Sequence, residues 1–295
     1  MKDSVLAQSI QITSSRLLTA MPDGRSWLVE LSSSLLTALP ISPIAMTRSS
    51  VTASLVEGAI SAGLTQTGFT PSVGSRTSLP GYIRWLVGNY VFAGQTPGLF
   101  RRAARRFVEL GRPVLAEFSL KKAAEEDGHA DLAYRDLHAL GLPATETIRA
   151  IQPTSATEFT DRFRSYVESS APVALFGFSY CLERMAVGRD DAFIRTVEAI
   201  CPPECRAFRF LKVHSNIGSD HDHVDEQLAF FESLPWADLV LITSAAYETA
   251  ELLARQPRMD QALTDEEIGR RLEKAGIRAP FSRDPEHAER GQGPT

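Results

Sequence analysis

The spacing of apolar residues is the feature that most restricts how this chain can fold. Most apolar side chains recur three and four positions apart, which is the spacing of one face of an α-helix. Alternating apolar and polar runs of useful length, which indicate half-buried strands, are missing. We therefore expect an all-α domain built from roughly seven to nine helices.

Prolines, glycines and polar clusters divide this pattern into segments. The clearest expected helices cover residues 26–39, 48–64, 82–93, 97–110, 113–140, 172–187, 208–234 and 238–255. The segment 172–187 is strongly apolar and predicts a buried helix. Residues 1–25 are polar and mixed, so we expect them to be poorly ordered. Residues 26–257 are expected to form one helical domain, followed by a charged, partly disordered tail at 258–295.

Composition excludes several classes of protein. The chain has 295 residues, 43% of them apolar, and a net charge of −5. Nucleic acid is therefore not expected as a partner, because phosphate binding needs clustered Lys and Arg. No run of about 18 apolar residues exists, so no membrane span is expected. Three cysteines and no secretory signal favour the cytoplasm. The sequence leaves open whether the chain forms a homodimer.

Three short segments contain residues that suit a metal centre. The first holds Glu126 and His129, the second holds Glu183 within an apolar run, and the third runs from His214 to Asp220 and His223. Together these six residues offer three imidazoles and three carboxylates. Nitrogen and oxygen ligands without a thiolate favour iron or manganese over structural zinc.

The first two segments have straightforward helical interpretations. Glu126 and His129 are three residues apart, so on one helix they share a face, as in the Glu-x-x-His device of di-iron bundles. The alternative is that Glu126 and His129 are ordinary surface residues of an exposed acidic helix. Glu183 lies on an apolar helix, where an ionised carboxylate needs a partner. That partner is either a metal ion or one of the arginines Arg184 and Arg189, unless the side chain faces water.

The third segment does not fit a straight helix. His214 would share a face with His221, whereas Asp220 and His223 would share a different one. We therefore expect a break or bulge near Gly218, since glycine tolerates unusual backbone angles. His221 is the reserve ligand if the helix runs straight.

Asp136 lies seven residues after His129 in the sequence. On one continuous helix the two side chains would share a face. Asp136 is then either a group that orients the His129 imidazole or an ordinary surface acid.

The order and spacing of these residues resemble the heme-oxygenase-like diiron oxidases and oxygenases, over roughly residues 80–255. That group shares its helical fold with heme oxygenase, thiaminase II and pyrroloquinoline quinone synthase. Its pattern is a Glu with a nearby His, a lone Glu on a later helix, and then a His, an Asp and a final His. The matching residues here are Glu126, His129, Glu183, His214, Asp220 and His223. The gap between His214 and Asp220 is longer than in that pattern.

The resemblance implies a concrete chemistry. Two ferrous ions would bind between the helices, and O2 would add across them to give a peroxo-diferric species. That species would oxygenate nitrogen or cleave a C–C bond in a small amino acid, amine or carboxylic acid. Candidates for the lining of a pocket beside the metals are Trp85, Phe176, Phe178, Tyr180 and Phe210. Core packing is the alternative for each of these aromatics and, taken singly, the favoured one.

Two alternatives belong to other classes of protein. One is a metal-free enzyme of the thiaminase II or pyrroloquinoline quinone synthase type, which would not need six such ligands in this order. The other is a non-catalytic helical protein that binds a partner or stores metal. A heme oxygenase would need one axial histidine near the first helix, whereas the first histidine here is His129.

Overall fold

The protein is described here from a computed structural model, which defines residues 7–21, 25–31, 36–41, 50–66, 78–218 and 220–278. The side chains of residues 36–38, 220 and 221 lie outside this description. The predicted disorder of the C-terminal tail concerns residues that lie largely outside it as well.

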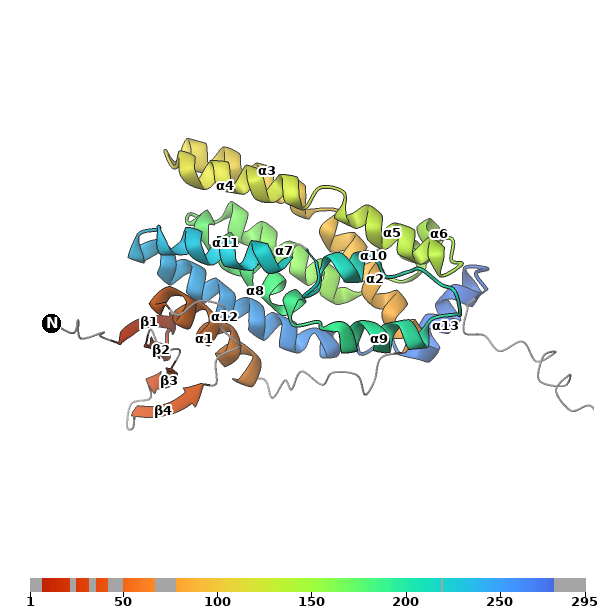
Figure 1. Cartoon of the computed structure of the whole chain (residues 1–295), viewed down its shortest axis with the longest axis horizontal. Helices are drawn as coiled ribbons and strands as arrows, with labels where there is room; N and C mark the ends of the chain where they lie inside the picture. Colours follow the sequence, from red (N-terminus) through yellow and green to blue (C-terminus); the bar gives the residue numbers. More distant parts are fainter. Residues whose placement is uncertain are drawn as a thin grey trace, which may run out of the picture.

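Helices make up most of the described chain, as the apolar spacing predicts (Figure 1). The helices in the first half are α1 (Val51–Gln66), α2 (Leu79–Ala93), α3 (Thr96–Glu109), α4 (Pro113–Glu125), α5 (His129–Ala139) and α6 (Ala144–Ala150). Those in the second half are α7 (Thr154–Glu168), the short 3-10 helix η1 (Pro172–Ala174), α8 (Leu175–Val187), α9 (Asp191–Ile200), α10 (Arg209–Val213), α11 (Asp220–Glu232), α12 (Trp236–Met259) and α13 (Asp265–Lys274). No helix in the described ranges is long and apolar enough to cross a membrane.

Local sequence explains several of the helix starts. Ser78 caps α2 by accepting a hydrogen bond from the Gly81 amide, and a proline occupies the first turn. Asp190 caps α9 in the same way, through the Phe193 amide at 2.9 Å. Thr264 caps α13 by accepting from the Glu267 amide. Each cap satisfies an amide that the helix itself leaves without a partner.

The N-terminal region differs from the prediction. It forms a four-stranded antiparallel meander, β1 (Gln8–Thr13), β2 (Arg16–Ala20), β3 (Ser26–Leu31) and β4 (Leu36–Ile41), in that spatial order. The helix predicted at 26–39 is therefore wrong, because this segment supplies β3 and β4. Ile10 and Ile12 alternate with polar residues in β1 and are buried, so a short strand pattern was present.

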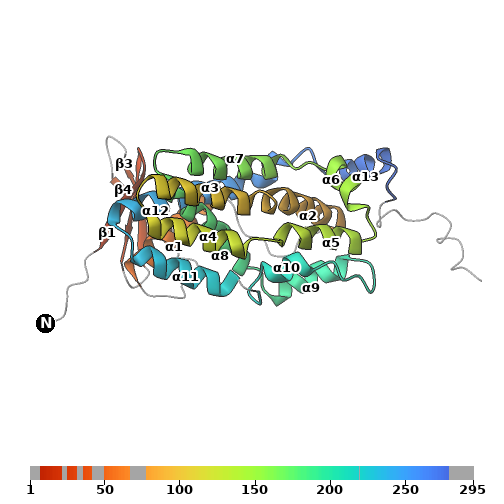
Figure 2. The same ribbon diagram turned by 90° about the horizontal axis from the view of Figure 1, so that it is seen from above.

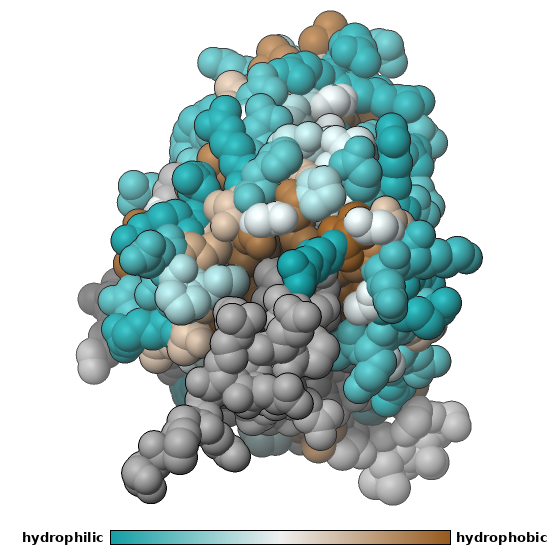
Figure 3. All heavy atoms as spheres, turned by 90° about the vertical axis from the view of Figure 1, so that its right-hand side faces the viewer, coloured by the Kyte–Doolittle hydropathy of each residue, from teal (hydrophilic) through white to brown (hydrophobic). Residues whose placement is uncertain are grey.

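The sheet packs on one end of the bundle, against α1 and α12 (Figure 1). Arg16 of β2 reaches across this boundary, where its guanidinium contacts the Tyr247 hydroxyl of α12 and pairs with Glu30 at 2.8 Å. The opposite end of the molecule presents mostly hydrophilic side chains around a smaller hydrophobic area (Figure 3).

Two of the long helices predicted from the sequence are interrupted, and both interruptions carry predicted metal ligands. The helix predicted at 113–140 is divided into α4 and α5, and the helix predicted at 208–234 is divided into α10 and α11. The expected break near Gly218 is thus confirmed, and it is a loop that begins at His214. The two interruptions lie beside one another along the bundle (Figure 2).

The C-terminal region also differs from the prediction in part. Residues 258–295 were expected to be a charged and partly disordered tail, yet α13 lies within them. Its Ile268 and Leu272 are fully buried in the same apolar cluster as Leu79 and Ile83 of α2. Two buried residues one turn apart are enough to dock a short helix that is otherwise strongly charged.

Candidate metal centre

Three of the predicted ligands converge at the two helix interruptions. Glu126, His129 and His214 each offer a ligand atom, and these atoms all lie within 4.8 Å of one another. His129 Nδ1 is 3.1 Å from Glu126 Oε2, and the two imidazole rings meet edge to face with their centres 4.7 Å apart. The three side chains are largely shielded from solvent. Such a set, two imidazoles and one carboxylate, is the facial ligand set of non-heme Fe(II) oxygenases.

A left-handed glycine, rather than a continuous helix face, brings Glu126 and His129 together. Helix α4 ends at Glu125, Glu126 caps its C-terminus, and Gly128 has φ +85°. His129 is then the first residue of α5. Glycine adopts this backbone angle without the steric penalty that a Cβ atom would cause. The prediction that both residues share one face of a straight helix is therefore wrong, although they do meet.

A second glycine shapes the interruption that carries His214. Helix α10 ends at Val213, and His214 caps it. A Cβ atom at Gly218 would lie 1.9 Å from the Val213 carbonyl oxygen and 2.5 Å from that of Lys212. Only glycine therefore allows the loop to fold back onto the end of α10 before α11 begins at Asp220.

Asp136 fixes α10 rather than orienting an imidazole. It is fully buried, and its carboxylate accepts the Phe210 amide at 2.9 Å and the Arg209 guanidinium at 3.2 Å. Burial raises the pKa of Asp136, although these hydrogen bonds oppose the rise. Both sequence interpretations of Asp136 are thus wrong. The Asp136 carboxylate thus holds α10, the short helix that ends at the candidate ligand His214. The Phe210 ring also packs against the His214 ring, with their centres 4.4 Å apart.

Glu183 is buried next to the triad but has a different partner. The ammonium of Lys122 lies 2.9 Å from Glu183 Oε1 and 2.8 Å from Glu125 Oε2, and Lys122 is only 1% exposed. Glu183 also accepts hydrogen bonds from Ser179 at 3.0 Å and from Gln227 at 2.7 Å. Arg184, one of the arginines considered from the sequence, pairs instead with the buried Glu57 at 2.9 Å.

His223 lies at the edge of this buried charge cluster. Its Nε2 is 3.8 Å from Glu125 Oε2. Asp220 opens α11, and its side chain, like that of His221, lies outside the described part of the chain. The assignment of Glu183, Asp220 and His223 to a metal ion stays a prediction.

Two ionisable groups of the site have shifted pKa values. Burial alone would raise the pKa of Glu126, but the hydrogen bond with His129 and the nearby His214 and Lys122 hold it below its ordinary value. Burial alone would lower the pKa of Lys122, but Glu183 and Glu125 hold it above its ordinary value. The region therefore favours a carboxylate at Glu126 and an ammonium at Lys122.

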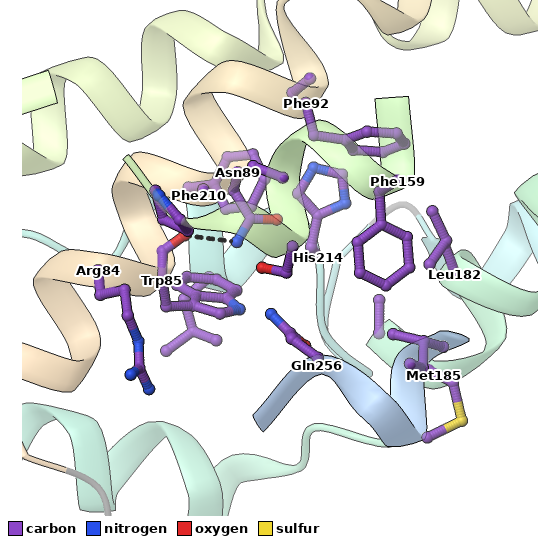
Figure 4. A pocket seen from close by; sticks show the side chains of 18 of the residues that line it. Arg84, Trp85, Asn89, Phe92, Phe159, Leu182, Met185, Phe210, His214 and Gln256 are labelled. Carbon is purple, nitrogen blue, oxygen red and sulfur yellow. Dashed lines mark hydrogen bonds between the residues drawn. The ribbon is translucent and has the colours of Figure 1, made fainter. Parts of the chain in front are cut away.

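A cavity of about 410 Å³ opens beside the three converging residues, and Glu126, Glu183 and His214 contribute to its wall. Figure 4 shows Asn89 and Gln256 pointing toward the same space as His214, among Trp85, Phe159 and Met185. The Asn89 amide donates to the Trp85 carbonyl at 2.8 Å. The volume is within the range of small-molecule sites.

The expected aromatic lining is only partly present. Trp85, Phe178 and Phe210 line the cavity. Phe176 instead stacks in the core on Phe107, with ring centres 5.8 Å apart. Tyr180 donates its hydroxyl to the buried Glu57, so it also faces the core.

Lys122 and Glu125 were missed by sequence reasoning. The inward-facing stripe of α4 includes Leu115, Ser119 and Lys122, spaced three and four apart, and Glu126 continues it. A lysine on that stripe, one turn before a predicted ligand, was the available signal.

Comparison with known proteins identifies the fold. No protein-family model matches the chain, and no curated protein sequence does. A solved domain of unknown function with a heme oxygenase-like fold from Shewanella denitrificans is 17% identical, with a TM-score of 0.57 over 77% of this chain and 95% of that one. The chain therefore has the heme-oxygenase-like helical fold.

Two further solved structures are similar at a lower level. A CADD-like protein of unknown function from Nostoc punctiforme is 15% identical, with a TM-score of 0.47 over 73% of this chain and 88% of that one. A TenA homolog from Pseudomonas syringae is 14% identical, with a TM-score of 0.48 over 73% of this chain and 93% of that one.

Proposed function

We propose that this protein is a non-heme iron oxidoreductase that activates O2. The observation that carries the proposal is the convergence of Glu126, His129 and His214 within 4.8 Å at the wall of a cavity. Two imidazoles and one carboxylate match the donor set of Fe(II) oxygenases, which leaves coordination positions open for O2 and substrate. The three residues therefore fit an iron ion, which would provide the O2-binding position and, with an external reductant, the electrons for O2 activation.

The chain's own residues prepare this site in three ways. Glu126 is held as a carboxylate, because its pKa lies below the ordinary value. Asp136 holds α10, and with it His214, against α5. Apolar side chains such as Phe159, Phe178 and Leu182 form part of the cavity wall beside the polar groups.

The substrate class follows from the resemblance and from the cavity. We propose a small amino acid, amine or carboxylic acid, oxidised by oxygenation at nitrogen or by C–C cleavage. A cavity of about 410 Å³ suits a molecule of this size. The polar side chains of Asn89 and Gln256 offer hydrogen bonds that could orient its polar group.

Iron binding is the direct test. Anaerobic Fe(II) titration against a competing chelator measures affinity, and nitric oxide added to the ferrous protein reports by electron paramagnetic resonance whether the iron is a high-spin site with an open position. We expect His129→Ala and His214→Ala to weaken iron binding by at least about 100-fold. They should also abolish O2 consumption in the presence of a reductant.

His138 provides a matched control for the His129 variant. It lies on the same helix, α5, and is exposed. His138→Ala should bind iron as the wild type does. A wild-type protein that binds no iron would instead favour the metal-free enzyme or the non-catalytic protein.

A further inference from the structure

A buried lysine contacts Glu183, one of the six residues that the sequence predicts as metal ligands. Lys122 is 1% exposed, and its ammonium lies 2.9 Å and 2.8 Å from carboxylate oxygens of Glu183 and Glu125. A lysine this deep in a protein needs such partners, because an isolated ammonium is costly to remove from water. The lysine therefore belongs to the charge balance of the site.

Most hydrogen-bond acceptor positions of the Glu183 carboxylate are occupied by protein donors. One oxygen faces the Lys122 ammonium and the Ser179 hydroxyl, and the other accepts from the Gln227 side chain at 2.7 Å. A carboxylate has about four acceptor positions in all. Donors already take three of these positions, and a metal ion bound through Glu183 would lie beside the Lys122 ammonium.

The charges around Glu183 also disfavour a second metal ion at this position. Glu125 and Glu183 face the ammonium of Lys122. Lys121 lies 3.5 Å from Glu125 at the surface, but it also pairs with Glu226, so its charge is not specific to this site. A divalent ion added here would stand close to a buried ammonium, and like charges at that separation repel strongly in a low dielectric.

We infer that the Lys122 ammonium takes the place of the second metal ion, so that the chain binds a single iron through Glu126, His129 and His214. This inference rests on the proposed function, since it presumes that the triad binds iron. It assigns Glu183 to a salt bridge instead of to metal ligation. Lys122 is then a positioning residue, which fixes Glu183 and Glu125 and provides a permanent positive charge beside the iron.

The test is the iron content of three proteins. Wild type, Lys122→Met and Lys121→Met are loaded with excess Fe(II) without oxygen, desalted, and analysed for iron per chain by mass spectrometry. Methionine keeps most of the lysine side chain's length and removes its charge. Lys121→Met is the matched control, because Lys121 is the neighbouring residue and is about half exposed.

We expect one iron per chain in wild type and in Lys121→Met, and close to two in Lys122→Met. Two irons in the wild type would overturn the inference, as would a folded Lys122→Met protein that still binds one. No iron in the wild type would refute the proposed function itself, which is a distinguishable result. Nitric oxide provides an independent reading, since one isolated ferrous site gives one spin per iron and a coupled pair gives less.

A double variant covers the case in which Lys122→Met does not fold. Lys122→Met with Glu183→Gln removes one charge of each sign, so no additional unbalanced charge is left in the core. It should fold and bind one iron, because glutamine is a poor replacement for a carboxylate ligand. Two irons in this double variant would show that a second ion binds without the Glu183 carboxylate, and would overturn the inference.

Discussion

Replacing Gly128 with alanine tests the helix interruption on which the candidate site depends. Gly128 has φ +85°, and nothing lies within 4 Å of the position that a Cβ atom would take. The cost of alanine is therefore backbone strain alone, about 1–2 kcal/mol for an L-residue in the left-handed region. Alanine also restricts the unfolded chain, which returns about 0.4–1 kcal/mol. The net expected loss is about 1 kcal/mol.

A continuous helix through 113–140 predicts the opposite sign. Glycine inside a helix is about 1 kcal/mol less favourable than alanine, so the same substitution would then stabilise the protein. The two structures thus differ by about 2 kcal/mol in the effect of one methyl group. Urea unfolding of the metal-free protein, followed by circular dichroism at the helix band, resolves a difference of this size.

Two matched variants make the assay specific. Gly128→Asn should lose less stability than Gly128→Ala, because asparagine tolerates the left-handed region. Gly98→Ala, at an exposed position in α3 with an open Cβ position and no positive φ, should instead gain about 0.5–1 kcal/mol. If Gly128→Ala stabilises the protein as Gly98→Ala does, the interruption between α4 and α5 is not there.

Three further outcomes are expected. Asp136→Ala leaves the buried Phe210 amide without its acceptor, so it should cost about 1–3 kcal/mol in urea unfolding and weaken iron binding although no ligand is removed. Arg184→Met removes the ion pair that the buried Glu57 makes at 2.9 Å, so it should lower the free energy of unfolding by about 3–5 kcal/mol and the melting temperature with it. Adding Glu57→Gln to this variant should recover much of the lost melting temperature. Burial raises the pKa of Tyr247 from 10.0 to about 12, so the unfolded chain loses this proton at a lower pH than the folded protein does. The free energy of unfolding of the wild type should therefore fall between about pH 10 and 12. That of Tyr247→Phe should fall less over the same pH range.

The helical part of the fold was predictable because its helices are long enough to repeat their pattern. The predicted segment 172–187 became η1 and α8, and 238–255 lies within α12. Each contains several turns, so an apolar face recurs often enough to be recognised. The strands are five or six residues long, and a strand such as β1 offers only Ile10 and Ile12 on its buried face. Two alternating residues are easily mistaken for chance.

The three converging residues of the candidate metal centre were predictable in type but not in geometry. Glu126 and His129 were recognised from a spacing that belongs to a continuous helix, yet the structure uses a left-handed glycine between them. Periodicity describes regular elements and carries no information about where two interrupted elements meet. Gly128 directly after three acidic residues was a possible C-terminal helix signal, since glycine commonly follows a helix end.

The interruptions also explain why the candidate ligands face one another. On an unbroken helix, His214 would be one of several polar residues in the rod 208–234, with no reason to face α5. Ending α10 at this residue turns its side chain toward the gap that Gly128 opens in the neighbouring rod, and Asp136 of α5 holds α10 there through the Phe210 amide. Two short helix ends cost backbone hydrogen bonds. The buried Asp136 carboxylate accepts the Phe210 amide at the start of α10, so α5 itself holds the short helix whose other end carries His214.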